Sequence, residues 1–252
     1  MIIFNLQTIC DFMPKSSYRQ LQTDLRKLGN PEKAKHSAWF FKTGKGQYGE
    51  GDVFVGVTMP AQRKVAKSYL HLPLEEVTLL LQSPEHEFRM CALLILVAQY
   101  KKGTEREREK IYSLYLQNTR WINNWDLVDT SAEYIVGDWL QGKKEKMNTL
   151  KALANSESLW ERRIAMLATF CYIKKGSTAE ALDIAKILLK DEHDLIHKAA
   201  GWMLRETGKR CSIQKEEAFL KAHYKHMPRT MLRYAIEHFP NAKRKAYLYG
   251  KV

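Results

Sequence analysis

Leu232-Arg233-Tyr234-Ala235 is one of four short phrases in which a basic residue lies two places before a small residue. The other three are Phe88-Arg89-Met90-Cys91-Ala92, Arg162-Arg163-Ile164-Ala165 and His197-Lys198-Ala199-Ala200. The last three basic positions lie 35 residues apart, and the step before them, of 74 residues, is close to double that length. A period of this length is typical of an array of helical repeats.

A fifth phrase, Val128-Asp129-Thr130-Ser131, divides the long step into 40 and 34 residues, and here an aspartate replaces the basic residue. Equivalent positions of a repeat array line one face of the superhelix. We therefore expect a cationic row with one carboxylate in it, formed by Arg89, Asp129, Arg163, Lys198 and Arg233. Such a row suits a phosphate backbone, and its lone acid is a candidate for chemistry.

The rest of the chain follows the same helical pattern. Apolar residues recur at helical spacing, and most breaks carry a helix stop or start signal. The breaks fall at Pro73, Ser83-Pro84, Gly103, Gly142, Gly176, Gly208 and Pro228. They delimit predicted helices at 17–28, 31–42, 60–70, 74–82, 84–101, 104–117, 123–140, 143–154, 157–174, 178–189, 193–207, 213–225, 228–238 and 241–249. With no long linker, the pattern predicts a single all-α domain over 1–252, a superhelical solenoid with a concave basic face.

One segment, 43–57, is rich in glycine. It lacks the Gly-Lys-Ser/Thr ending of a phosphate-binding P-loop, which argues against a nucleotide site. We expect a flexible loop that returns through a short extended piece. Because glycine lets a backbone approach closely, this loop could also contact a phosphate backbone.

The net charge of +13 over 252 residues favours a polyanionic partner such as nucleic acid, although a basic surface without a specific partner would have the same charge. Cys10, Cys91, Cys171 and Cys211 are too scattered for a zinc site or a disulfide framework, so we expect reduced thiols inside the cell. The first residues lack the pattern of a signal peptide. The apolar run 91–98 is too short to cross a membrane, and we expect no membrane association.

Two tryptophans share helix faces with charged residues. Trp125 lies one turn before Asp129, and Trp202 lies between Lys198 and Arg205 at helical spacing. Tryptophan is the strongest aromatic partner of a cation, and a carboxylate orients water or stabilises positive charge. This set suits hydrolysis of a bond whose transition state is cationic.

Other interpretations of these residues stay open. Trp125 and Trp202 could be core residues, and Asp129 could be a helix cap or a salt-bridge partner, as could Asp126. We assign the remaining tryptophans, Trp39, Trp121, Trp139 and Trp160, to core or inter-helix packing. His193 and His197 have the i,i+4 spacing of metal ligands, but no Glu or Cys completes a set, so we expect neither metal nor cofactor.

Three segments together resemble the AlkD-type DNA glycosylases of the DNA alkylation repair family. They are Asn124-Trp125-Asp126-Leu127-Val128-Asp129, Trp160-Glu161-Arg162-Arg163-Ile164-Ala165 and the segment 198–206, which reads KAAGWMLRE. Asn30-Pro31-Glu32-Lys33-Ala34 is similar as well, so the resemblance covers roughly 18–240. It implies HEAT-like repeats that curve around duplex DNA, and excision of cationic N3- and N7-alkylated purines without base flipping.

The resemblance also implies roles for single residues. Asp129 would be the catalytic carboxylate, and Trp125 and Trp202 would pack against the lesion's sugar and backbone. Arg163 and Arg205 would lie beside the lesion strand. The family often presents a tyrosine from its second helix, where this chain has Trp39 and Phe40. We include Phe40 among the DNA contacts, with Lys198 and Arg233 from the basic row.

The expected partner is therefore duplex DNA with alkylated bases, bound by a monomer in a bacterial-type cytoplasm, near the nucleoid. Two other functions stay open. One is a repeat protein that binds damaged or branched DNA without catalysis, and the other is a scaffold for protein interactions, a common use of α solenoids.

Overall fold

The computed structural model describes residues 17–252, and most of this part is helical apart from one long connection over 41–58. Cys10 and the residues that argued against a signal peptide lie outside it. The N-terminal half contains α1 (Tyr18–Lys27), α2 (Pro31–Phe40), α3 (Met59–Ser68), α4 (Leu74–Leu81), α5 (His86–Lys102), α6 (Glu105–Gln117), the 3-10 turn η1 (Thr119–Trp121) and α7 (Trp125–Ala132). The C-terminal half contains the π-helical turn η2 (Glu133–Gly137), α8 (Asp138–Leu140), α9 (Lys146–Ala154), α10 (Leu159–Ala168), α11 (Phe170–Lys174), α12 (Ala179–Ile187), η3 (Leu188–Lys190), α13 (Asp194–Arg210), α14 (Ile213–His223), α15 (Arg229–Ala235), η4 (Ile236–His238) and α16 (Asn241–Leu248).

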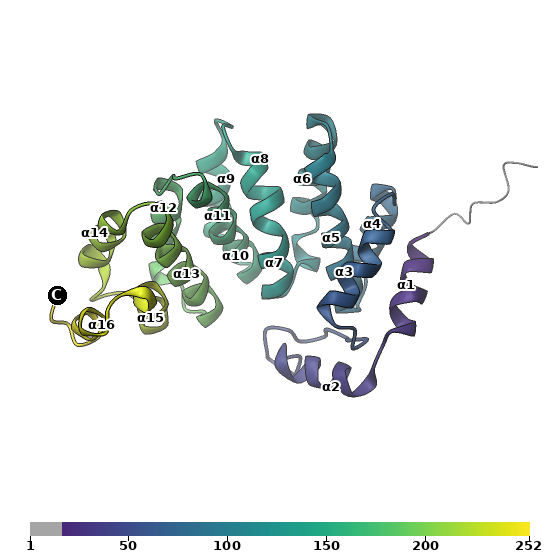
Figure 1. Cartoon of the computed structure of the whole chain (residues 1–252), viewed down its shortest axis with the longest axis horizontal. Helices are drawn as coiled ribbons and strands as arrows, with labels where there is room; N and C mark the ends of the chain where they lie inside the picture. Colours follow the sequence, from purple (N-terminus) through teal and green to yellow (C-terminus); the bar gives the residue numbers. More distant parts are fainter. Residues whose placement is uncertain (1–16) are drawn as a thin grey trace, which may run out of the picture.

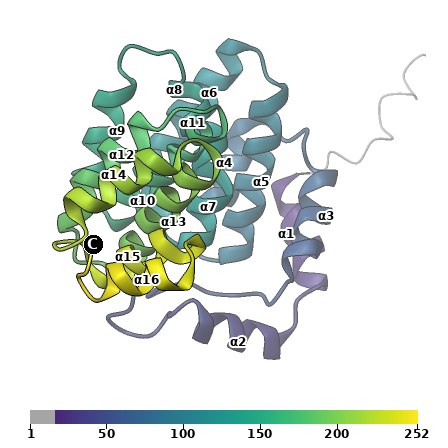
Figure 2. The same ribbon diagram turned by 60° about the vertical axis from the view of Figure 1, so that its left-hand side comes forward.

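The helices form a superhelical solenoid, as the repeat period predicts. An inner row runs α5, α7, α10, α13, α15, each packed on the next, and α4, α9, α12 and α14 pack against its outer side. Figure 1 shows the stack curving from α1 at one end to α16 at the other. Figures 1 and 2 both place α2, α15 and α16 at the same edge of the stack.

The repeated phrase marks where the inner helices touch. Its small residue is fully buried in every copy: Cys91, Ser131, Ala165, Ala200 and Ala235. A small side chain lets neighbouring helix backbones approach, so the array stacks closely at each step. The phrase therefore has a packing role that is independent of its charged residue.

Several predicted boundaries are wrong. Helix α13 continues through Gly208 to Arg210, where we expected a break. A Cβ at Gly208 would lie 1.7 Å from Glu216 Oε2, so this glycine permits close packing against α14 and does not end a helix. The predicted helices 123–140 and 157–174 are each divided, the first by η2 and the second at Thr169, whose hydroxyl donates to the carbonyl of Met166.

The glycine-rich segment 43–57 is anchored to the body more firmly than a flexible loop would be. The Glu87 carboxylate accepts hydrogen bonds from the amides of Val55, Gly56 and Val57 at 2.7–3.2 Å. The expected extended piece is limited to an isolated bridge between Val53 and Glu85; no strand forms in the part of the chain that the structure describes.

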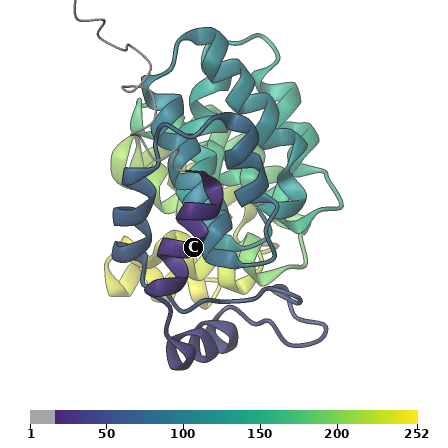
Figure 3. The ribbon, with the colours of Figure 1, turned by 90° about the vertical axis from the view of Figure 1, so that its right-hand side faces the viewer.

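Helix α2 and this segment form an arm beside the stack. No residue of α2 is buried, and Figure 3 shows the arm extending beyond the stacked helices. The two ends of the arm are joined by a hydrogen bond: the backbone amide of Asn30 donates to the carbonyl of Val55 at 3.1 Å. Within residues 17–252 no helix combines the length and the apolar character needed to span a bilayer.

Candidate functional site

A pocket of about 790 Å³ lies between the arm and the inner helices α7, α10, α13 and α15. Seven of the eight residues that we predicted as site residues line it: Phe40, Trp125, Asp129, Arg163, Lys198, Trp202 and Arg205. Tertiary packing thus brings together residues that are up to 165 positions apart in the sequence. The remaining lining residues are Trp39, Lys42, Tyr48, His193, Asp194, Leu195 and Tyr234.

The start of α7 positions the proposed catalytic pair. Asn124 is the N-cap, and its side chain accepts a hydrogen bond from the amide of Trp125 at 2.9 Å. Trp125 is therefore the first residue of the helix, and Asp129 follows one turn later on the same face. Both side chains then point into the pocket.

Asp129 is held by Arg163 from the neighbouring helix α10. Nε and Nη2 of Arg163 each donate to a different carboxylate oxygen of Asp129 at 2.8 Å, and Nη1 donates to the carbonyl of Leu195. The Arg163 side chain is 6% exposed and that of Asp129 21%, so the carboxylate is the member that faces the pocket more openly. Burial raises the pKa of Asp129 above its ordinary value of 3.8, and Arg163 acts in the opposite direction.

This geometry changes the expected role of Arg163. We predicted it as a DNA contact, but its guanidinium is buried and bonded on all three nitrogens. Breaking a buried, bidentate pair is costly. Within the free protein Arg163 therefore serves to orient Asp129.

Two further cations of the pocket, Lys198 and Arg205, are also paired with acids. Lys198 lies 2.7 Å from Asp194, with both side chains about half exposed, and Arg205 is paired with Glu237. Exposed ion pairs of this kind contribute only about 0–1 kcal/mol. A phosphate can therefore replace Asp194 and Glu237 at little cost, because each of these acids is about half exposed, in contrast to the buried guanidinium of Arg163 and its bidentate bond to Asp129.

Two members of the predicted cationic row lie elsewhere. Arg89 is 1% exposed and is bonded to Asp52 and to the carbonyls of Ser83 and Pro84, so it is not part of the concave surface. Arg233 is exposed but lies outside the pocket, and the next residue, Tyr234, lines it instead. The repeat period locates equivalent positions but not the direction of long side chains.

The tryptophans line the pocket while also packing on the core. Trp125 stacks on Phe41 with ring centres 5.4 Å apart, and Trp202 lies 5.7 Å from Phe170. Trp39 is 67% exposed, so its assignment to the core is wrong. Together with Phe40, which is 48% exposed, it forms an uncovered aromatic pair at the mouth of the pocket.

Tyr48 is the pocket residue that the sequence analysis missed most clearly. It comes from the glycine-rich segment and packs edge-on against Trp160 and His193, at 6.1 and 6.5 Å between ring centres. Burial raises the pKa of its phenol, so the hydroxyl stays protonated at neutral pH. In the sequence, Tyr48 is recognisable only as an aromatic residue within a glycine-rich loop, and this pattern does not indicate where the loop packs.

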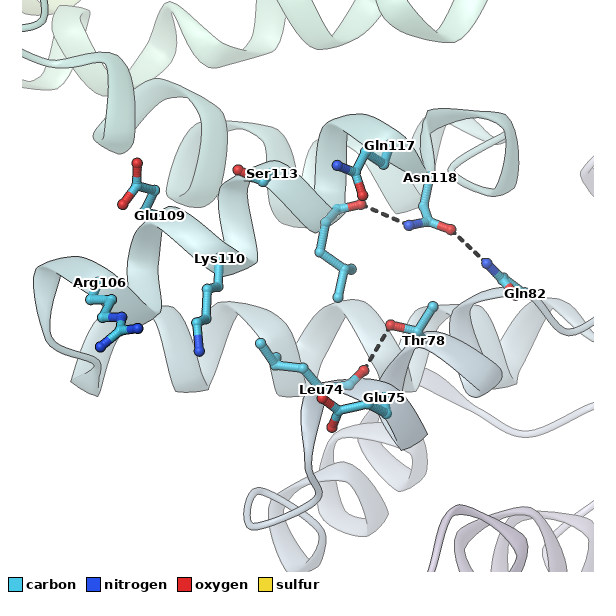
Figure 4. Close-up of a pocket in the computed structure, with 11 residues that line it drawn as sticks. Leu74, Glu75, Thr78, Gln82, Arg106, Glu109, Lys110, Ser113, Gln117 and Asn118 are labelled. Atoms are coloured by element: carbon cyan, nitrogen blue, oxygen red, sulfur yellow. Dashed lines mark hydrogen bonds between the residues drawn. The ribbon is translucent and has the colours of Figure 1, made fainter.

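A second cavity, between α4 and α6, shares no residue with this pocket (Figure 4). Three of its polar side chains bond to nearby protein groups: Gln82 donates to Asn118, Asn118 to the carbonyl of Leu114, and Thr78 to the carbonyl of Leu74. These groups are therefore not directed at a ligand. In residues 17–252 no cluster of His, Cys, Asp or Glu could hold a metal ion.

The fold places the chain among the helical-repeat solenoids, with its pocket on the inner side of the array. The sequence pattern of the DNA alkylation repair enzyme family matches residues 21–239, and the chain belongs to that family.

Two solved structures have the same fold. A predicted DNA alkylation repair enzyme from Enterococcus faecalis is 20% identical, with a TM-score of 0.66 over 84% of this chain and 97% of that one. A member of a protein family related to the HEAT-like repeat DNA glycosylases, with affinity for branched DNA structures, is 14% identical, with a TM-score of 0.54 over 84% and 83%. No curated protein matches the sequence.

Proposed function

We propose that this protein is a monofunctional DNA glycosylase that removes cationic alkylated purines, of the 3-methyladenine and 7-methylguanine type, from duplex DNA. The observation that carries the proposal is the position of Asp129, a partly exposed carboxylate in a pocket with two tryptophans and exchangeable cations. Membership of the DNA alkylation repair enzyme family supports it.

The chemistry needs little beyond these groups. When the N-glycosidic bond breaks, its electron pair moves to the base nitrogen, which neutralises the positive charge of the alkylated base. The deoxyribose becomes a cation, which the Asp129 carboxylate stabilises. Water then bonds to C1′ and gives up a proton, which the Asp129 carboxylate accepts.

The tryptophans and the cations have separate tasks in this proposal. The rings of Trp125 and Trp202 stabilise positive charge on the base and sugar, because the face of an indole attracts cations. Lys198 and Arg205 exchange their acid partners for phosphates of the lesion strand. No step requires the base to leave the duplex.

A non-catalytic DNA-binding protein is the second candidate. The bidentate bond between Asp129 and Arg163 would be explained equally well as a structural ion pair. The structural neighbour with affinity for branched DNA structures also favours this candidate. Such a protein would bind a four-way junction more tightly than a duplex and release no base.

Release of methylated bases tests the proposal directly. Methylated duplex is incubated with excess protein, and free 7-methylguanine and 3-methyladenine are measured against a reaction without protein. Asp191→Asn is a matched control, because Asp191 pairs with the adjacent Arg162 at 2.6 Å but does not line the pocket. Base release by the parent and by this control, but not by Asp129→Asn, is the expected result; no release by the parent refutes the proposal.

A further inference from the structure

A histidine outside the pocket links the glycine-rich segment to the helix that carries the catalytic pair. His86, the first residue of α5, lies between two carboxylates. Its Nδ1 is 3.1 Å from Asp52 Oδ2, and its Nε2 is 2.9 Å from Asp126 Oδ2. The side chains of His86 and Asp52 are each 3% exposed, so their contact is shielded from water, whereas Asp126, whose side chain is 18% exposed, is partly open to it.

The surroundings require both ring nitrogens to donate. A carboxylate oxygen can only accept, and His86 faces one on each side, so it must carry two protons and a positive charge. Burial lowers the pKa of His86, but Asp126 and Asp52 outweigh that effect and raise it to about 9. Arg89, the other charged group that faces it, acts to lower the pKa.

Aromatic rings enclose this cation. Phe54 and Phe41 lie 4.6 and 5.0 Å from the His86 ring, and Phe41 also stacks on Trp125. The stack therefore runs from the glycine-rich segment through His86 and Phe41 to the wall of the pocket. A shift of His86 would be transmitted to the indole of Trp125.

The two carboxylates belong to the two sides of the pocket. Asp126 directly follows Trp125 and lies three residues before Asp129, within the first turn of α7. Asp52 lies four residues after Tyr48, which the glycine-rich segment presents to the pocket. His86 thus bridges α7, which contributes Trp125 and Asp129 to the pocket, and the glycine-rich segment, which contributes Tyr48.

Charge balance alone does not account for the bridge. Arg89 already neutralises Asp52, with Nη2 at 2.6 Å from Oδ1. Arg89 does not reach Asp126, so the contact that His86 adds is its bond to Asp126. Fold stability does not explain the bridge either, because a well-packed set of apolar residues of similar size often stabilises a fold at least as much as a buried cation between two acids.

We propose that His86 is a positioning residue for base excision, which holds Trp125 and Asp129 in register with Tyr48 through its bond to Asp126. This inference rests on the proposed glycosylase activity.

Two matched substitutions separate positioning from mere folding. In His86→Gln the amide reaches the place of Nε2 and can donate to Asp126, whereas in His86→Asn it reaches the place of Nδ1 and can donate only to Asp52. Both variants lose the charge and part of the ring stack. We expect His86→Asn to slow single-turnover release of 7-methylguanine about tenfold or more, as misplacement of reacting groups does, and His86→Gln to slow it less than about threefold. The affinity for unmodified duplex should be the same in both.

The pH profile gives a second readout. Excision by the parent should decline as the pH rises through about 9, when His86 loses a proton and one of its two bonds. The decline should be absent in His86→Gln, which has no proton to lose there. Equal rates in the two variants, or an alkaline decline that persists in His86→Gln, would overturn the proposal.

Nitrogen-15 NMR decides the point even if no base is released. The parent should show two protonated ring nitrogens for His86 up to pH 8. The indole signal of Trp125 should move further in His86→Asn than in His86→Gln, because both variants lose the ring beside Phe41 but only His86→Asn loses the bond to Asp126. A singly protonated His86 at neutral pH, or an equal shift of the Trp125 signal in both variants, refutes the bridge. Failure of the parent to release any base refutes the glycosylase function, and the NMR result then still decides whether His86 positions Trp125.

Discussion

Asp129→Asn tests the proposed mechanism most directly, because the substitution keeps the shape of the side chain and removes its charge, together with one of the two hydrogen bonds from Arg163. A carboxylate about 4 Å from a cationic sugar contributes about 4 kcal/mol at the effective dielectric of a protein surface site. Removing it should slow base release by about three decades. Affinity for DNA should be equal or severalfold higher, because an acid near the phosphates is gone and Arg163 loses the partner that now neutralises it.

The ion pair allows a sharper form of this test. In Asp129→Asn the charge of Arg163 is left unbalanced, and at about twice the distance from the sugar it opposes the cation by about 2 kcal/mol. The double variant Asp129→Asn, Arg163→Gln should therefore recover about thirtyfold of the lost rate. The assay is single-turnover release of 7-methylguanine, with binding and thermal unfolding measured alongside and Asp191→Asn as control. Equal rates in the parent and Asp129→Asn would refute the catalytic assignment, and a double variant slower than the single one would refute the electrostatic explanation.

Three further predictions follow from the same pocket. Affinity for unmodified duplex should fall steeply as the salt concentration rises, and Lys198→Ala should reduce the slope of log affinity against log salt by about one. A binding titration from low to physiological salt would measure both. An affinity that does not change with salt would exclude a nucleic-acid partner. Trp125→Ala and Trp202→Ala should each slow excision about tenfold or more while weakening binding to unmodified DNA less, because a desolvated cation–π contact contributes about 2 kcal/mol; unfolding of both variants in circular dichroism would instead make these tryptophans core residues. Excision should fall as the pH is lowered through the pKa of Asp129, which lies above 3.8, since only the ionised carboxylate stabilises the sugar; the profile of Asp129→Asn, corrected for release without protein, should be flat there.

Much of the fold was accessible from the sequence because its signals are local. Apolar spacing and helix-ending residues predicted the order of helices, and the small residue of each phrase is buried on an inner helix that packs on its neighbour. The failures are tertiary. Gly208 looks like a helix end, and only the tertiary structure shows that α13 continues through it, with the Glu216 side chain of the next helix lying against the space that a Cβ would take.

The candidate site divides in the same way. The sequence by itself determined that Trp125 and Asp129 share one helix face, and that Trp202 shares a face with Lys198 and Arg205, because helical periodicity dictates both. Which charged side chains meet was decided only by tertiary structure. Arg89 and Arg163 occupy equivalent positions of the repeat, yet one is buried against Asp52 of a distant loop and the other holds the catalytic candidate. A long, flexible side chain takes the partner that folding brings within reach, and a pattern of local spacing contains no information about partners from elsewhere in the chain.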